Sequence, residues 1–107
     1  MFARQNRFSF RKGVPKKIFS NSFLFIRYDK STKPKFECAV VVGKKVDTRA
    51  VVRNSVKRML VSIIKELIDT DTQYIIVMYA KKPILQMKRE EIKEQMTNVF
   101  ATIGIIK

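Results

Sequence analysis

The chain has 107 residues and a formal net charge of +14. This length suits one domain with a modest core, and so large a positive charge favours a polyanionic partner, either nucleic acid or an anionic membrane. The sequence contains no histidine, which removes the commonest general base and metal ligand, and its single cysteine, Cys38, can form neither an intrachain disulfide nor a metal site by itself.

The positive charge is concentrated in one part of the chain. Residues 1–65 contain 17 Lys and Arg and 3 acidic residues, whereas residues 66–107 contain 6 of each kind. A chain that was basic only for solubility would not need this segregation. The longest apolar run, Ile75–Ala80, is too short to span a bilayer, and no signal-peptide pattern is present, so we expect a cytoplasmic protein without a membrane segment.

The chain is expected to form a single RNA-binding domain, residues 1–107, with a basic arm at residues 1–21 and a sandwich at residues 22–107. The arm has no acidic residue, and its cations are interleaved with phenylalanines. This mixture suits single-stranded nucleic acid, because rings stack on bases while cations hold phosphates. Phe8 and Phe10 can equally tuck into the core, which is the favoured interpretation for Phe19. Gly13 and Pro15 interrupt any long helix in the arm.

Two strands are predicted after the arm. Ser22–Tyr28 is rich in aromatic and β-branched residues, and the polar stretch Asp29–Lys35 is typical of a turn. Phe36–Val42 then completes a predicted hairpin, in which Phe36, Cys38 and Val40 share one face.

A central helix is predicted over Arg49–Ile68. Its apolar residues recur at steps of three and four, which gives one buried stripe: Val52, Val56, Met59, Leu60, Ile63 and Leu67. Arg53, Asn54, Lys57 and Arg58 lie on the opposite arc. Asp47 or Thr48 is placed to cap the helix, and its free amides near Lys44, Lys45 and Arg49 suit a phosphate. An ordinary surface helix with a solvated charged face is the alternative.

The remainder of the chain predicts one more strand and one more helix. The apolar run Tyr74–Ala80 is typical of a strand covered on both faces, and Pro83 follows its end. Arg89–Thr102 predicts a helix with Glu90 and Glu91 in its first turn and a buried stripe of Ile92, Met96, Val99, Phe100 and Ile103. The order β-β-α-β-α indicates an α/β (α+β) two-layer sandwich, a small sheet with a basic central helix and a C-terminal helix.

No catalytic residue and no metal ligand is predicted in the chain. Glu90 and Glu91 are adjacent on a helix and do not face each other, and Asp69 and Asp71 are typical turn residues. The glycines are too few for a glycine-rich phosphate loop. The composition therefore favours a binding protein that contributes charge and shape.

The central helix and the segment before it resemble the signature of the bacterial ribonuclease P protein component. The resemblance is carried by Gly43-Lys44-Lys45-Val46 followed by Arg49-Ala50-Val51-Val52-Arg53-Asn54-Ser55-Val56-Lys57-Arg58, and it continues in Tyr74–Val77, Ala80–Pro83 and the helix from Glu90. It covers most of residues 22–100. The central block is specific, because two clusters of cations must fall at fixed helical spacing beside an asparagine.

This resemblance implies an accessory subunit of an RNA-based endoribonuclease that matures the 5′ end of tRNA. The RNA subunit is expected to carry the active site with Mg²⁺, which RNA and substrate mainly hold, while the protein binds that RNA and the 5′ leader of precursor tRNA. The expected RNA-binding residues are Lys44, Lys45, Arg49, Arg53, Asn54, Lys57 and Arg58. Candidate leader-binding residues are Phe8, Phe10, Arg11 and Lys12. The family fold implies a left-handed crossover, an exception to the general rule, and we expect a monomer in the holoenzyme.

The sequence departs from the family pattern at three places. Ser55 stands where the family usually has a second arginine, so one phosphate contact is expected to be missing. Gly13 and Pro15 leave little room for the helix that usually precedes the first strand. Lys88 replaces the usual Ser or Thr cap of the last helix, whose start is expected to fray.

Three other functions are compatible with a basic chain. A stand-alone binder of structured RNA, of the ribosomal type, would share the basic face without any role in cleavage. An autonomous nuclease is disfavoured by the absence of histidine. A cationic membrane-surface peptide is disfavoured because the apolar stripe of the central helix is needed to cover the sheet.

Overall fold

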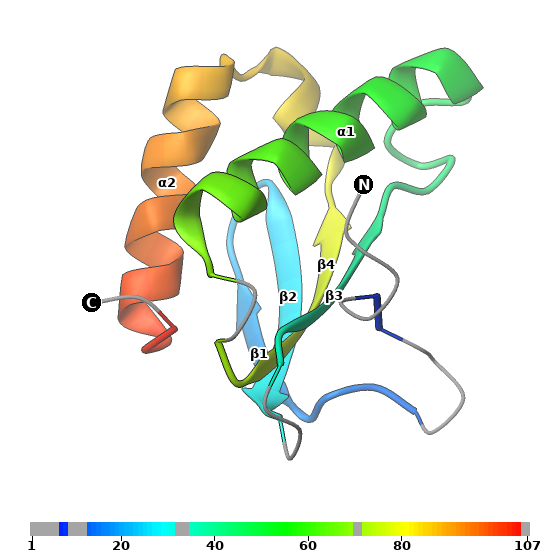
Figure 1. The fold of residues 1–107 in the computed structure, drawn as a ribbon. Coiled ribbons are helices and arrows are strands. Elements are labelled where there is room, and N and C mark those ends of the chain that lie inside the picture. The colour runs from blue at the N-terminus through cyan, green and yellow to red at the C-terminus, as the bar shows by residue number, and fades with distance from the viewer. Residues whose placement is uncertain (1–6, 9–12, 32–34, 70–71, 106–107) are drawn as a thin grey trace.

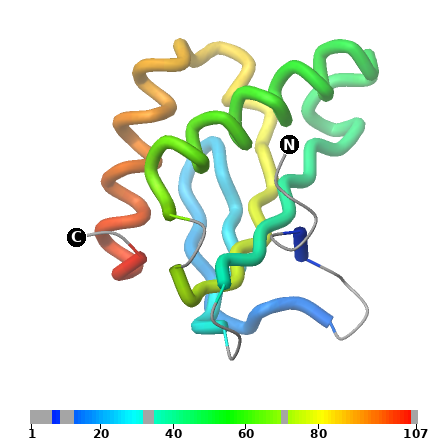
Figure 2. Tube along the Cα trace, viewed as in Figure 1, coloured from blue at the N-terminus to red at the C-terminus, as the bar shows by residue number. Residues whose placement is uncertain are grey.

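The computed structural model describes residues 7–8, 13–31, 35–69 and 72–105. The elements follow in the order β1 (Lys17–Ser20), β2 (Leu24–Lys30), β3 (Glu37–Val41), α1 (Ala50–Leu67), β4 (Tyr74–Ala80), a 3-10 helix (Lys82–Gln86) and α2 (Arg89–Thr102). One sheet forms a layer, and both α-helices lie against the same face of it (Figure 1 and Figure 2). The predicted two-layer α+β sandwich is therefore confirmed, and β4 and α2 have the predicted bounds.

The sheet has the strand order β1-β2-β4-β3. Strand β2 is antiparallel to both β1 and β4, whereas β3 is parallel to β4. The predicted hairpin is therefore wrong, because β4 lies between β2 and β3. Ile76, Val77 and Met78 fit this position: they are fully buried although they point to alternating faces, as is typical of a strand at the centre of a sheet.

The first strand is also a departure from prediction, since β1 lies inside the predicted basic arm. Its Phe19 pairs with Ile26 of β2 and packs against the core, as favoured from the sequence. Ile18 is on the other face and is 52% exposed. A strand of four residues at the sheet edge carries too little apolar pattern to stand out among cations.

A crossover joins the two parallel strands through α1. In Figure 1, β3 and β4 both run upward, α1 passes in front of the sheet, and β4 lies to the left of β3. The connection is therefore left-handed, as the family resemblance implied. It places the start of α1 beyond the end of β3, which is the edge strand.

The core lies between the sheet and the two helices. Alternation along β3 directs Phe36, Cys38 and Val40 toward the helices, as predicted. The predicted stripe of α1 is buried at its centre and half-buried at its edges, and the buried set is Val56, Leu60, Val61, Ile63 and Ile64. On α2 the buried residues are Ile92, Met96, Val99 and Phe100, while Ile103 is half-buried. The apolar periodicity of both helices thus marks the faces that they bury.

The start of α1 differs from the prediction. Arg49 is the N-cap residue and makes no side-chain capping hydrogen bond. The expected cap by Asp47 or Thr48 is wrong, because the Asp47 carboxylate already binds Arg49, accepting a hydrogen bond of 2.8 Å from its backbone N–H. Lys88 is the N-cap of α2 and likewise provides no side-chain cap. No helix in the described ranges has the length and apolar character needed to cross a membrane.

Candidate nucleic-acid interface

The predicted RNA-binding residues gather at one end of the helical layer. Lys44 and Lys45 lie in a turn that is closed by a 3.0 Å hydrogen bond from the Val46 N–H to the Gly43 carbonyl. Val46 is buried and anchors this turn to the core, while both lysines remain exposed. The first turns of α1 contribute the other members of the set: Arg49, Arg53, Asn54, Lys57 and Arg58. The structure therefore unites the loop and the helix start in one cationic surface.

Arg49 differs from its neighbours because it is paired within the chain. Its Nη2 atom lies 2.9 Å from Oδ2 of Asp47, and its Nε atom donates to Oδ1 at 3.1 Å. These side-chain hydrogen bonds, together with the one from the Arg49 backbone N–H, lower the pKa of Asp47 to about 2. Arg49 therefore offers a partner less net charge than its sequence position suggested.

Arg53 has a structural task as well. Its Nη1 atom donates to the backbone carbonyls of Thr48, at 2.8 Å, and Asp47, at 3.2 Å. These two carbonyls lie in the segment that leads into α1, so the guanidinium group ties that segment to the second turn of the helix. The residue remains half-buried and part of the cationic surface.

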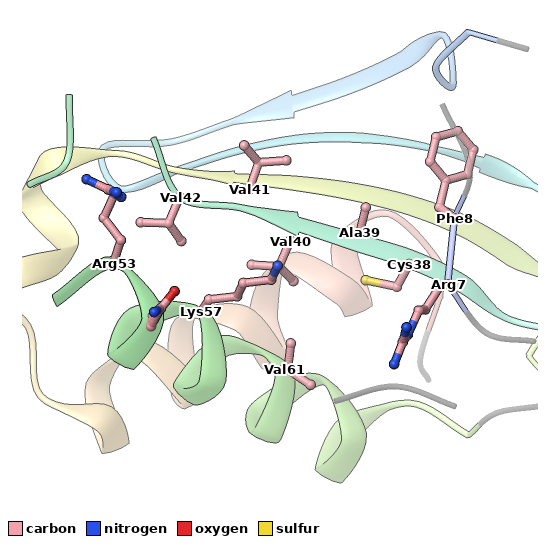
Figure 3. Close-up of a pocket in the computed structure, with 11 residues that line it drawn as sticks. Arg7, Phe8, Cys38, Ala39, Val40, Val41, Val42, Arg53, Lys57 and Val61 are labelled. Atoms are coloured by element: carbon pink, nitrogen blue, oxygen red, sulfur yellow. The ribbon is translucent and has the colours of Figure 1, made fainter. Parts of the chain in front are cut away.

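A groove with a volume of about 450 Å³ runs between β3 and α1 (Figure 3). Arg53, Asn54, Lys57 and Val61 line it from α1, and residues 38–42 line it from the strand side. Arg7 and Phe8 lie at one end. No residue in this described lining is acidic. The groove is therefore an apolar trough with cationic walls.

Of the four candidate leader-binding residues, only Phe8 belongs to the described part of the chain; Phe10, Arg11 and Lys12 lie outside it. The Phe8 N–H donates a 3.0 Å hydrogen bond to the Cys38 carbonyl, and Arg7 forms a parallel bridge with Cys38. Figure 3 shows the Phe8 ring on the same side of β3 as Ala39 and Val41, away from α1. Phe8 therefore marks the border between the groove and the sheet face opposite α1 and α2, called here the outer sheet face.

The outer sheet face carries aromatic residues that the sequence interpretation did not select. The rings of Phe25 and Tyr79 pack edge to face with centroids 5.8 Å apart, and the Arg27 guanidinium lies 5.5 Å from the Phe25 centroid. All three are half-buried. A signal was available: these residues alternate with the buried Leu24 and Ile26 or follow the buried Met78, and so must point away from the helices.

The described residues provide groups that can bind nucleic acid, and they show neither a candidate metal site nor a reactive thiol. They contain no group of three or more Cys, Asp or Glu side chains that could hold a metal ion. Cys38 is buried, and this burial raises the pKa of its thiol, which keeps the sulfur protonated and unreactive. The arrangement can hold phosphates on cations and bases on rings.

Comparisons with known proteins agree with this geometry. The family model for Ribonuclease P matches residues 3–104. The chain belongs to the bacterial ribonuclease P protein family. It is 36% identical over 99 residues to the ribonuclease P protein component of Bacillus cereus (strain Q1), covering 90% of this chain and 82% of that protein, and equally identical to the one of Bacillus anthracis (strain CDC 684 / NRRL 3495), covering 79% of that protein.

Solved ribonuclease P proteins share the fold. The Staphylococcus aureus protein superposes with a TM-score of 0.72 at 20% identity, over 85% of this chain and 84% of that one. The Thermotoga maritima protein gives a TM-score of 0.65 at 21% identity, over 78% and 79%. The chain is thus the protein subunit of ribonuclease P, an endoribonuclease that matures the 5′ end of tRNA, and an RNA partner follows from that membership.

Proposed function

We propose that the cationic surface from Lys44 to Arg58 docks on the catalytic RNA of ribonuclease P. The observation that carries this proposal is the lack of internal neutralisation: within the described residues, no carboxylate forms an ion pair with Lys44, Lys45, Lys57 or Arg58. Phosphates of a folded RNA would supply the missing negative charge and release counterions on binding. Such contacts follow the shape of the RNA backbone more than its sequence.

The outer sheet face is the proposed site for the single-stranded 5′ leader. Phe25 and Tyr79 present rings on which bases can stack, and Arg27 and Phe8 add a cation and a further ring. The residues pair across the sheet, with Phe25 opposite Tyr79 and Arg27 opposite Val77. A leader that crosses this face would follow the strand-to-strand direction and reach the edge strand β3 beside Phe8.

The chain itself would act by positioning. Mg²⁺ bound to the RNA and substrate would activate the water that hydrolyses the phosphodiester, whereas the described residues lack the cluster of carboxylates that commonly binds this ion. By neutralising phosphates around the RNA active site, the cations of α1 would lower the electrostatic repulsion between the catalytic RNA and its polyanionic substrate. We expect one copy of the chain to do this in the cytoplasm.

A reconstitution assay tests the proposal. Catalytic RNA and precursor tRNA are mixed at low Mg²⁺ with and without the chain, and cleavage at the 5′ end of the mature sequence is measured. We expect the chain to stimulate cleavage. RNA binding without stimulation would instead support a stand-alone binder of structured RNA.

Leader recognition is tested by substrate binding in the same reconstituted complex. Replacing Tyr79 by alanine should weaken binding of a substrate with a long leader by roughly 5- to 100-fold, the effect of losing one stacked base. Binding of a tRNA without a leader should not change. Tyr74→Ala is the control, because this tyrosine also lies on β4 but packs against the core. Equal losses for both substrates would contradict a leader site on the sheet face.

A further inference from the structure

The groove between β3 and α1 has a well-defined apolar floor. Its floor consists of Cys38, Val40 and Val61, which are only 2%, 6% and 5% exposed. Figure 3 shows Lys57 extending above this floor, with Arg53 toward one end and Arg7 toward the other. The groove thus places apolar surface below and cations along its length.

A second hollow on α1 shows how particular this arrangement is. It lies on the other side of Val61 and is lined by Arg58, Ser62, Lys65 and Glu66. Glu66 brings a carboxylate into that hollow, and it is paired there with Arg89 and Lys93. The two hollows share one wall residue, yet only the groove combines a deep apolar floor with a lining that is cationic and free of acids among the described residues.

We propose that the groove receives one unstacked nucleotide of the catalytic RNA. Its base would lie on the floor made by Val40 and Val61, its phosphate on the Lys57 ammonium, and its polar edge beside the Asn54 amide at the rim. The volume of about 450 Å³ lies within the range of small-ligand pockets. This inference rests on the proposed docking of α1 on the RNA, and it adds that docking includes base insertion as well as phosphate contacts.

The chemistry of the lining favours a nucleotide over other occupants. A second copy of the chain would bring a further charge of +14 against Arg7, Arg53 and Lys57. A nucleotide combines an apolar ring face, a polar edge and a negative charge, which match the floor, the amide and the lysine in turn. Asn54 offers one donor group and one acceptor, so it can pair with a base edge that presents both.

The inference is tested by crossing groove variants with abasic substitutions in the RNA. Single unpaired nucleotides of the catalytic RNA are replaced one at a time by abasic residues, and the affinity of each RNA is measured for the parent chain and for Val61→Trp, which fills the groove. We expect one position where base removal weakens binding of the parent by roughly 5- to 100-fold. The same removal should have no effect on the Val61→Trp chain, because its base is already excluded.

Matched variants keep the result interpretable. Lys57→Ala should reduce the loss of affinity that base removal causes at that same position. Lys65→Ala, two helical turns further along α1, should leave that loss unchanged. Should Val61→Trp fail to fold by circular dichroism, Val42→Trp fills the groove from a half-buried position just after β3. The proposal is overturned if, at every position, base removal weakens binding equally for the parent and for the filled-groove variant. It is also overturned if filling the groove changes the oligomeric state and leaves RNA affinity intact. Docking of the whole cationic surface on the RNA is tested independently by the affinity of a variant in which Lys44 and Lys45 are replaced by alanine, because both lysines lie outside the groove.

Discussion

The cations of the loop and first turns of α1 differ from those of α2 in what lies opposite them. On α2, Arg89 and Lys93 both reach Glu66 of α1, at 3.0 and 2.9 Å. That cluster joins the two helices, and the Glu66 carboxylate offsets one of its two positive charges. Lys44, Lys45, Lys57 and Arg58 have no such counterpart in the described structure, and mutual repulsion among them opposes folding. The same residue types thus serve the structure where a carboxylate of the chain pairs with them, and they remain available to an anionic partner where none does.

The comparison is tested most strongly by removing charge from both regions in equal amounts. Replacing Lys57 and Arg58 together by alanine should lower affinity for the catalytic RNA by roughly 10- to 100-fold and reduce the salt slope of binding by about two. Replacing Lys82 and Lys88, exposed lysines at the start of the 3-10 helix and at the N-cap of α2, removes the same charge outside the cationic surface. Filter binding across a salt series measures both. Equal losses would show that only total charge matters.

Arg53 sharpens the comparison, because it belongs to the proposed RNA-binding surface and also holds the segment before α1 through two hydrogen bonds. Arg53→Ala removes two hydrogen bonds to the carbonyls of Asp47 and Thr48 and should lower the free energy of unfolding by about 1–2 kcal/mol. Urea denaturation measures this effect. Arg58→Ala is the control, since Arg58 is exposed on the next turn and should leave stability nearly unchanged. Equal stability of the two variants would leave Arg53 with an RNA-binding role alone.

Such double roles mark the limit of what the sequence predicts. A continuous apolar run predicted β4 and a periodic apolar stripe predicted α2, both with the observed bounds, and the family motif selected the cations of α1. Which strand pairs with which depends on contacts between distant segments, so the hairpin prediction was wrong. The continuous apolar run of β4 was interpreted as a strand covered on both faces, which did not tell which strands lie beside it. The pairing of Asp47 with Arg49 was missed because a carboxylate before a helix usually serves as its cap. Phe25, Arg27 and Tyr79 became candidates only when the helices were seen to cover the other face.

Asp47 is the one acidic residue within the cationic surface, so its removal should strengthen RNA binding. Asp47→Asn keeps an oxygen that can accept from the Arg49 N–H but releases the guanidinium from its ion pair. We expect affinity at low salt to rise by roughly two- to fivefold, with the gain fading as salt is raised. An unchanged affinity would mean that Arg49 does not face the RNA.

The same carboxylate predicts a pH dependence of stability. Its pKa of about 2 in the folded chain lies below the value near 3.9 of an unfolded aspartate. Its contribution is therefore complete above about pH 4 and is lost as the pH falls toward 2. Stability measured across this range should decline more for the parent chain than for Asp47→Asn. Parallel curves would show that the ion pair with Arg49 does not persist in solution.

The smallest effect is expected in the neutralised region, at Glu66. Hydrogen bonds from Lys93 and then Arg89 lower the pKa of this carboxyl, so its stabilising contribution is present above the unfolded value near 4.3 and is lost as the pH falls through the lowered one. Glu66→Gln should lower the melting temperature slightly at neutral pH, because all three side chains are substantially exposed and water screens their attraction. The variant should also leave RNA affinity close to that of the parent, since the two cations it frees lie beside α2. A clear gain in RNA binding would extend the interface to α2 and remove the distinction between the two regions.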